Sequence, residues 1–231
     1  MNISHYSKAF VERGFVTLDL SEELADWVAT TKANADAWLQ EQPPNLECRH
    51  NEGKFPVQAF PLPRDLEVLL NDLLVDWNGH LGECAQLSTL VNGFDKGSED
   101  HGRHVDGAYE GLAWAGVLVG IFLQFIPKRD AGNLVVWPAT HRETQGRFSS
   151  LGNEPDVCDV RRAIRSHSSC GHHEVVSGPA GTVVVMDHRL EHGMVPHRVA
   201  NLTRHVVYFR LPKFTNCPVE VVNRHHFLKH G

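Results

Sequence analysis

The sequence lacks the cysteine pattern of a disulfide-stabilised or zinc-binding protein. Its five cysteines are widely spaced, and no two of them form a CxxC pair. An odd number of isolated cysteines is typical of reduced thiols in an intracellular protein, because small secreted proteins carry even numbers that pair. We therefore expect a cytoplasmic protein whose stability comes from a hydrophobic core.

Long apolar runs and a basic surface are also missing. The longest apolar run, AGVLVGIFLQFI at residues 115–126, is too short to cross a bilayer as a helix. The start MNISHYSKAF lacks the basic and apolar regions of a signal peptide. The formal net charge is −6 and the lysines and arginines are scattered, which argues against a nucleic-acid partner because phosphate binding needs clustered cations. These absences predict a soluble protein with neither a membrane nor a nucleic acid as partner, and they leave the oligomeric state undefined.

The N-terminal third of the sequence carries helical patterns. Apolar residues recur at helical spacing over residues 4–13 and 64–77. Ser21 stands where the N-cap of a helix running towards Gln42 is expected, with two acidic residues after it. Between the first two helices, FVTLDL at residues 15–20 predicts a short strand.

After about residue 84, short β-branched or aromatic runs alternate with turn residues. The runs predict strands at residues 85–94, 115–126, 133–137, 173–177, 181–186 and 204–211. Because residues 115–126 are apolar on both faces, we expect this strand to be covered on each side. The prediction is a mainly β fold with flanking α-helices in one domain, residues 1–231. A mostly helical layer (1–84) precedes a β core (85–212), and the polar segment 142–172 is expected to be a loop.

The sequence GRHVDG at residues 102–107 contains a candidate metal-binding pair. His104 and Asp106 are two residues apart, so an extended backbone points both side chains to the same face. An imidazole and a carboxylate projected together can supply two of the three ligands of the facial triad that holds non-haem iron. The triplet alone also fits a surface turn with a solvated histidine and aspartate.

A third ligand is expected from a distant strand, and three histidines compete for that role. His192 follows the predicted strand at 181–186, and His188 and His197 are close to it in sequence. HRLEH at residues 188–192 also matches the HxxEH pattern of inverted zinc peptidases. That pattern requires a helix, whereas β-prone residues precede this segment and a glycine and a proline follow it, so we disfavour the peptidase interpretation.

An arginine opens the strand RHVVYFRL, twelve residues after His192. A planar guanidinium can pair bidentately with a carboxylate, which makes Arg204 a candidate anchor for an acidic cosubstrate. Strand alternation puts Arg204 and Arg210 on the same face, so Arg210 is the alternative anchor.

Two further clusters of polar residues are better explained as surface features than as binding sites. HSSCGHH at residues 167–173 contains metal-binding residue types, but no second cluster at zinc spacing supports it, so a polar loop is the better prediction. The cluster Arg161, Arg162 and Arg165 is expected on a solvated helical face. If the substrate is anionic, these arginines become candidate contacts together with Arg103 and Arg147.

With these motifs in place, the chain resembles the phytanoyl-CoA dioxygenase family of iron(II)- and 2-oxoglutarate-dependent oxygenases. The resemblance runs from RGFVTLDL to Arg204 and is most specific at DAGNLVVWPATHR, residues 130–142. It implies a double-stranded β-helix, the jelly-roll core also found in cupins. It also implies His104, Asp106 and His192 as the catalytic iron ligands, with Arg204 anchoring 2-oxoglutarate. The spacing from Arg204 that the family shows is what selects His192 over its neighbours.

The sequence departs from the family pattern at two positions. Ala139 replaces the usual glycine, and Met194 stands where a hydroxyl residue often helps to hold 2-oxoglutarate. Asn92, on the strand before the HxD triplet, is a candidate for an additional contact to 2-oxoglutarate.

The resemblance implies an enzyme, a non-haem iron dioxygenase that uses O2 and 2-oxoglutarate. It would hydroxylate or otherwise oxidise a small molecule and release succinate and CO2. Related halogenases leave open the coordination position that Asp106 fills, so oxidation without halide is expected. The alternatives are a cupin-type metalloenzyme without 2-oxoglutarate, against which Arg204 argues, and a non-catalytic binding barrel, against which the intact triad argues. The identity of the substrate is not encoded in any motif.

Overall fold

The computed structural model describes residues 3–41, 48–57, 59–74, 79, 81, 84–91, 102–105, 108–109, 112–113, 116–150, 159, 162–163, 166, 168 and 171–211. The helices are α1 (Ile3–Arg13), α2 (Ala25–Gln40), α3 (Arg64–Leu73) and α4 (Thr140–Ser149). The strands are β1 (Phe15–Asp19), β2 (Cys48–Pro56), β3 (Cys84–Leu90), β4 (Ala108–Tyr109), β5 (Leu112–Ala113), β6 (Val117–Phe122), β7 (Leu134–Val136), β8 (Glu174–Val175), β9 (Thr182–Asp187), β10 (His192–Met194) and β11 (Arg204–Leu211). None of the helices in these ranges is both long and apolar enough to cross a bilayer.

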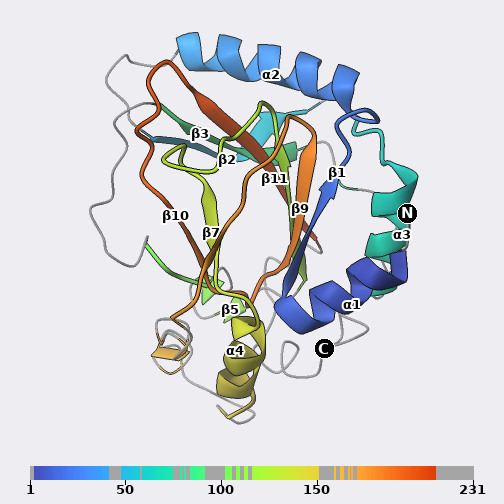
Figure 1. The fold of residues 1–231 in the computed structure, drawn as a ribbon, viewed down its shortest axis with the longest axis vertical. Helices are drawn as coiled ribbons and strands as arrows, with labels where there is room; N and C mark the ends of the chain where they lie inside the picture. The colour runs from blue at the N-terminus through green and yellow to red at the C-terminus, as the bar shows by residue number, and fades with distance from the viewer. Residues whose placement is uncertain are drawn as a thin grey trace.

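Most of the strands form a large antiparallel sheet and a small one (Figure 1), and β4 and β5 pair with each other as a separate two-stranded sheet. The large sheet has the order β1-β9-β6-β11-β3-β2, and the small sheet has the order β10-β7-β8. Phe122 and Val206 of the large sheet share one buried cluster with Leu134 and Val136 of the small sheet, so the two sheets enclose a core. This arrangement confirms the predicted double-stranded β-helix.

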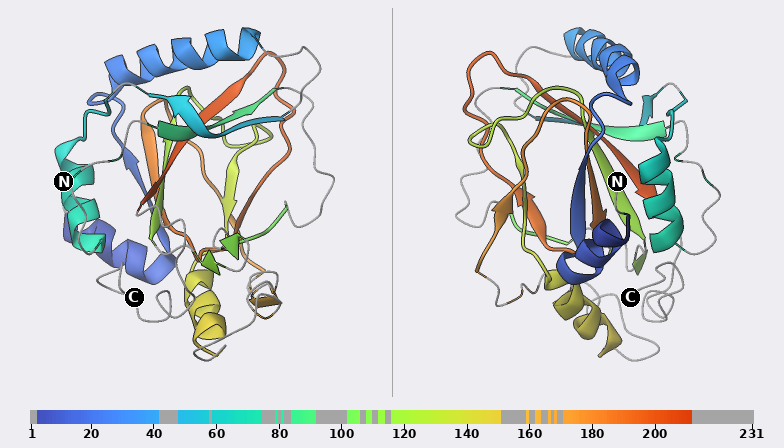
Figure 2. Two further views of the ribbon diagram at one scale, coloured as in Figure 1. Left: turned by 180° about the vertical axis from the view of Figure 1, so that it is seen from behind. Right: turned by 45° about the vertical axis from the view of Figure 1, so that its right-hand side comes forward.

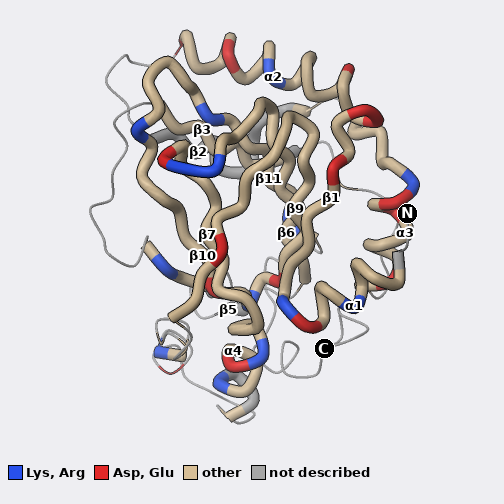
Figure 3. Tube along the Cα trace, viewed as in Figure 1, with Lys and Arg blue, Asp and Glu red and all other residues tan. Residues whose placement is uncertain are grey.

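A second buried cluster lies on the outer face of the large sheet, where α1, α2 and α3 cover it (Figure 2). The side chains of β11 alternate between the two cores, with Val206 facing the interior and Val207 facing the helices. The same alternation in β6 explains why that strand is apolar on both faces, as predicted. Figure 3 shows few charged residues along β6 and β9, whose sequences contain only one, Asp187.

The N-terminal layer contains the predicted strand, β1, and one strand that the sequence does not predict, β2. Both β1 and β2 belong to the large sheet, and β2 forms its edge beside β3. The sequence CRHNEGKFP of β2 is polar and lacks an alternating pattern, which is compatible with an edge strand but gives no signal for one. Ser21 is not the N-cap of α2. Residues 21–24 form a turn instead, and the helix begins after Leu24 with no side-chain cap.

The predicted loop at 142–172 begins as a helix, because α4 occupies Thr140–Ser149. Its sequence, THRETQGRFS, has little apolar character, and tertiary contacts stabilise it instead. Thr140 Oγ1 donates to the Trp137 carbonyl, and the rings and hydroxyls of His141 and Thr144 are buried against the core. Helices of this kind are held by packing more than by propensity.

A partly buried chain of polar contacts fastens α2 to the large sheet. The fully buried ring of His205 contacts Thr89 Oγ1 through Nδ1 at 2.8 Å and Asp36 Oδ1 through Nε2 at 3.0 Å. Lys32 Nζ donates to the other oxygen of Asp36 at 2.5 Å. Burial lowers the pKa of His205 despite its bond to Asp36. The pKa of Asp36 is also lowered: burial alone would raise it, and its bonds to Lys32 and His205 outweigh that effect.

We expect the free energy of unfolding to fall as the pH drops from 6.5 to 5. Burial lowers the pKa values of His141, His197 and His205, so the unfolded chain binds protons more readily than the folded chain does. Stability is therefore fully present above the unfolded histidine pKa of about 6.5 and is lost below it. Each histidine contributes a slope of up to about 1.4 kcal/mol per pH unit.

Urea denaturation at several pH values measures this slope. The variant His205→Gln keeps an amide able to contact Thr89 and Asp36 but cannot titrate. The number of protons taken up on unfolding, which sets the slope, is therefore expected to be smaller by close to one. A pH-independent free energy of unfolding in the wild type between pH 5 and 7 contradicts the prediction.

Candidate functional site

The structure brings His104 and His192 together at the start of β10. The two residues form an isolated antiparallel bridge, in which each backbone N–H donates to the carbonyl of the other at 2.8 and 2.9 Å. Their imidazole rings lie with centroids 4.4 Å apart. His192 is 6 % exposed, whereas His104 is exposed to solvent, so the pair can be reached from the side of His104.

Both histidines are oriented in the same way by the backbone. Nδ1 of His104 contacts the carbonyl of Gly102 at 2.7 Å, and Nδ1 of His192 contacts the carbonyl of Leu190 at 2.9 Å. A carbonyl can only accept, so each Nδ1 donates a proton, and in the neutral ring the lone pair is then on Nε2. This is the tautomer in which an imidazole binds a metal through Nε2 while a second contact fixes the ring.

Two predicted site residues, Asp106 and Asn92, lie outside the described residues. Within the described part of the chain, no group of three or more His, Cys, Asp or Glu side chains is arranged to hold a metal ion. The predicted triad needs Asp106 as its third member, so it remains a prediction.

Of the three competing histidines, only His192 pairs with His104 among the described residues. His188 Nδ1 lies against the backbone of Gly116 instead. His197 is fully buried, with Nε2 at 2.7 Å from the carbonyl of Leu202. Residues 188–190 form a turn and 192–194 a strand, so HRLEH has no helical face of the kind that a zinc peptidase requires.

Arg204 begins β11 and points into the interior between the two sheets. A Cβ atom added to Gly132, in the loop before β7, would lie 3.3 Å from Arg204 Cδ, so the two residues are in close contact. Arg204 is 1 % exposed, and its guanidinium contacts two neutral hydroxyl groups, Ser88 Oγ at 3.1 Å and Tyr208 Oη at 3.2 Å. No described carboxylate pairs with it, and its Nε has no hydrogen-bond partner.

A buried cation without a counter-ion is costly, because desolvation of a charge is compensated only by pairing. The hydroxyls of Ser88 and Tyr208 orient the guanidinium but do not neutralise it. The arrangement therefore fits an anionic ligand that enters the interior and pairs with Arg204. Arg210, the alternative anchor, is less buried, and its Nη1 contacts the side chain of Gln86.

Sequence reasoning missed Ser88 and Tyr208. Strand alternation does place Tyr208 on the face of Arg204, so a signal for it was present. Ser88 lies on β3, and only the β3–β11 register, which pairs Val206 with Ser88, brings it to Arg204. The hydroxyls beside Arg204 therefore come from β3 and β11, while Met194 on β10 supplies none.

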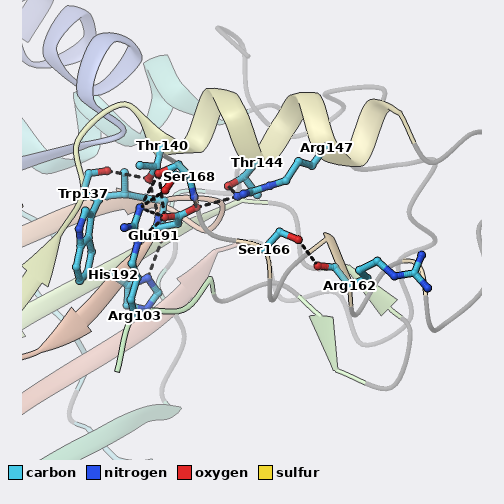
Figure 4. A network of polar contacts seen from close by, with 11 residues as sticks. Arg103, Trp137, Thr140, Thr144, Arg147, Arg162, Ser166, Ser168, Glu191 and His192 are labelled. Atoms are coloured by element: carbon cyan, nitrogen blue, oxygen red, sulfur yellow. Dashed lines mark hydrogen bonds and ion pairs between the residues drawn. The ribbon is translucent and has the colours of Figure 1, made fainter. Parts of the chain in front are cut away.

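Glu191, which precedes His192, is the centre of a second group of contacts that the sequence did not reveal (Figure 4). It is fully buried, and its carboxylate accepts from Arg103 Nε at 2.6 Å, Arg147 Nη2 at 2.8 Å and the backbone N–H of Ser168 at 2.7 Å. Burial alone would raise its pKa, and the bonds from Arg147, Ser168 and Arg103 lower it instead.

These contacts alter the predicted roles of the arginines. Arg103 and Arg147, named as candidate contacts for an anionic substrate, are both paired with Glu191. Arg162 is exposed and pairs with Asp159, in agreement with a solvated helical face. Arg161 and Arg165 lie outside the described residues, as do several members of the segment 167–173.

Asn133 in the block DAGNLVVWPATHR binds the backbone of two segments outside the block. The buried side chain of Asn133 donates to the carbonyls of Pro127 at 2.6 Å and Val176 at 3.0 Å, which fixes the start of β7. Ala139 has a backbone φ of 68°, in the left-handed region that favours glycine. The conformation explains why glycine suits this position and shows that alanine occupies it with strain.

Comparisons with solved structures give the same fold. AviO1 from Streptomyces viridochromogenes Tue57 superposes with a TM-score of 0.54 at 18% sequence identity, over 94% of this chain and 98% of that protein. EctD from S. alaskensis, solved with 2-oxoglutarate and 5-hydroxyectoine, gives 0.53 at 19% identity over 89% and 74% of the two chains. HygX from Streptomyces hygroscopicus, solved with nickel and 2-oxoglutarate, gives 0.55 at 13% identity over 89% and 85%.

No family model matches the sequence. No curated protein matches it either. The likeness therefore lies in the fold, which this chain shares with proteins of very different sequence.

Proposed function

We propose that this protein is an iron(II)- and 2-oxoglutarate-dependent oxygenase that oxidises a small molecule. The observation that carries the proposal is Arg204, a fully buried guanidinium with no carboxylate partner among the described residues. It lies in the same barrel as a pair of histidines whose Nδ1 atoms both donate to backbone carbonyls, which leaves Nε2 of each neutral ring as the metal-binding atom. The structures of EctD and HygX with 2-oxoglutarate support the proposal, because those proteins have the same fold.

In this proposal His104, Asp106 and His192 bind the iron and Arg204 binds the distal carboxylate of 2-oxoglutarate. Iron(II), 2-oxoglutarate and O2 together supply an oxidant able to hydroxylate an unactivated C–H bond. The balance is one substrate, one 2-oxoglutarate and one O2 converted to hydroxylated substrate, succinate and CO2. A carboxylate at position 106 supports hydroxylation, or another oxidation without halide, as the outcome.

The chain's own residues contribute orientation and exclusion of water. The carbonyls of Gly102 and Leu190 keep the protons on Nδ1 of the two histidines, so both rings offer Nε2 to the iron. Ser88 and Tyr208 hold the guanidinium of Arg204 in place for a bidentate contact. The apolar side chains between the sheets keep water away from the reacting centre.

An anaerobic titration of iron(II) and 2-oxoglutarate tests the proposal. We expect a weak visible metal-to-ligand charge-transfer band in the wild type, and its disappearance in Asp106→Ala. Iron that binds without producing the band on addition of 2-oxoglutarate would favour a metalloenzyme that does not use this cosubstrate. A wild-type protein that binds neither iron nor 2-oxoglutarate would favour a non-catalytic barrel.

A further inference from the structure

We propose that Glu191 and Arg103 are positioning residues that hold the two iron-binding histidines at the separation that one ion requires. The inference rests on the proposed function, because it concerns the same metal site. Each residue directly precedes one of the histidines, Arg103 before His104 and Glu191 before His192. Neighbouring residues of an extended chain point to opposite faces, so the pair lies behind the histidines rather than beside the ion.

The backbone pairing of the histidines is short and needs support. His104 and His192 form an isolated bridge of two hydrogen bonds, and among the described residues around His104 it is not part of a longer ladder. The ion pair between Arg103 and Glu191 crosses this bridge on the other face, through Nε at 2.6 Å and a second contact from Nη2. It therefore joins the same two segments a second time and limits their sliding.

Hydrogen bonds restrain both the backbone and the carboxylate of Glu191. Its N–H donates to Thr140 Oγ1 at 3.0 Å, and its carbonyl accepts from the N–H of Trp137 at 2.9 Å. The carboxylate, fully buried, accepts from the N–H and hydroxyl of Ser168 at 2.7 and 3.1 Å and from Arg147 on α4. Figure 4 shows these groups gathered around the carboxylate beside α4.

Several contacts also restrain the side chain of Arg103. Its guanidinium lies over the ring of Trp137, with Cζ 4.6 Å from the ring centroid, and its Nη2 reaches Ser168 Oγ at 2.5 Å. A guanidinium stacked on an indole and paired with a carboxylate has little rotational freedom. Arg147, in contrast, reaches Glu191 from α4 and adjoins neither histidine in sequence. The two arginines therefore differ in their expected effect on the metal.

Measurement of metal affinity separates this role from general stabilisation. Mn(II) alone, detected by the loss of its solution EPR signal, is the probe, and His104→Ala identifies binding at this site. We expect Glu191→Gln and Arg103→Met to weaken Mn(II) binding by about tenfold to a hundredfold, the size of effect known for groups that orient metal ligands. Arg147→Met is expected to change the affinity by less than threefold.

Asp187→Asn is the matched control, because Asp187 is also a buried carboxylate paired with an arginine close to His192, but its partner is Arg189. It is expected to lose stability, measured by thermal unfolding, with Mn(II) affinity within threefold of the wild type. Equal affinity in Glu191→Gln, Arg103→Met and the wild type would overturn the inference and leave the proposed function intact. If Glu191→Gln does not fold, Arg103→Met decides alone. A wild-type protein that binds no Mn(II) or iron(II) would overturn both.

Discussion

Arg204→Met is expected to bind 2-oxoglutarate at least about a hundredfold more weakly than the wild type, in line with the loss of a buried charge pair. Arg204 is the only buried guanidinium in the described interior for which no anionic partner is found. Methionine fills a similar volume without charge, so the distal carboxylate of the cosubstrate loses its partner. Calorimetric titration of 2-oxoglutarate into the anaerobic Mn(II)-loaded protein measures the change.

The stability of Arg204→Met should not fall along with its affinity for 2-oxoglutarate. Removal of a buried, unneutralised charge relieves a desolvation penalty, so the ligand-free variant is expected to be at least as stable as the wild type. A loss of affinity without a loss of stability excludes misfolding as its cause. Arg204→Lys is expected to be intermediate, because an ammonium group cannot make the planar bidentate contact.

Arg210→Met is the matched control, on the same face of the same strand. It is expected to bind 2-oxoglutarate within threefold of the wild type. The reverse result, in which Arg210→Met loses the cosubstrate and Arg204→Met keeps it, would assign the anchor to Arg210.

Asp187→Ala is expected to lower the free energy of unfolding by about 3–5 kcal/mol, the usual cost of breaking a buried ion pair. Asp187 is 1 % exposed, and Arg189 pairs with both of its oxygens, at 2.8 and 2.6 Å. Burial alone would raise the pKa of Asp187, but Arg189 holds it well below its usual range. Removal of the carboxylate leaves the Arg189 guanidinium buried beside an uncharged residue, Gln145.

A double variant distinguishes the loss of the pair from the loss of packing. Asp187→Ala combined with Arg189→Met leaves no buried charge, so it is expected to be more stable than Asp187→Ala alone. Urea denaturation followed by circular dichroism gives the four free energies of the cycle. Strictly additive effects would show that the pair has no coupling.

Glu174→Ala, which breaks the half-exposed pair with Arg13, is expected to lower the free energy of unfolding by less than about 1 kcal/mol.

The sequence predicted the parts of the fold that follow from local pattern. Strand alternation in RHVVYFRL indicated that Arg204 and Tyr208 share a face, and the structure has both facing the interior core. The apolar run at 115–126 predicted a strand covered on both sides, and β6 lies between two buried clusters. The structure pairs His104 with His192, two of the ligands chosen from the resemblance, but metal binding by them and the roles of Asp106 and Asn92 stay predictions.

The features that the sequence did not predict depend on tertiary contacts. β2 is a polar edge strand, and one paired neighbour is enough to hold it without an alternating pattern. The helix α4 has little apolar character and is stabilised by buried polar groups. In the sequence, Glu191 is visible only as part of a peptidase-like motif. Its partners, Arg103, Arg147 and Ser168, come from three other places in the chain, so no local pattern predicts these contacts.

Under the proposed function, the bridge between His104 and His192 also determines when during folding the protein can take up iron. Arg103 and Glu191, which flank the bridge, are 88 residues apart in sequence. Contacts between such distant segments form only after the entropy cost of closing the intervening loop has been overcome, and they come late in folding. An ion that needs both histidines finds its site only in a chain that has already closed. We therefore expect the newly made protein to fold empty and to be loaded afterwards, so that its metal content cannot exceed the fraction that has folded.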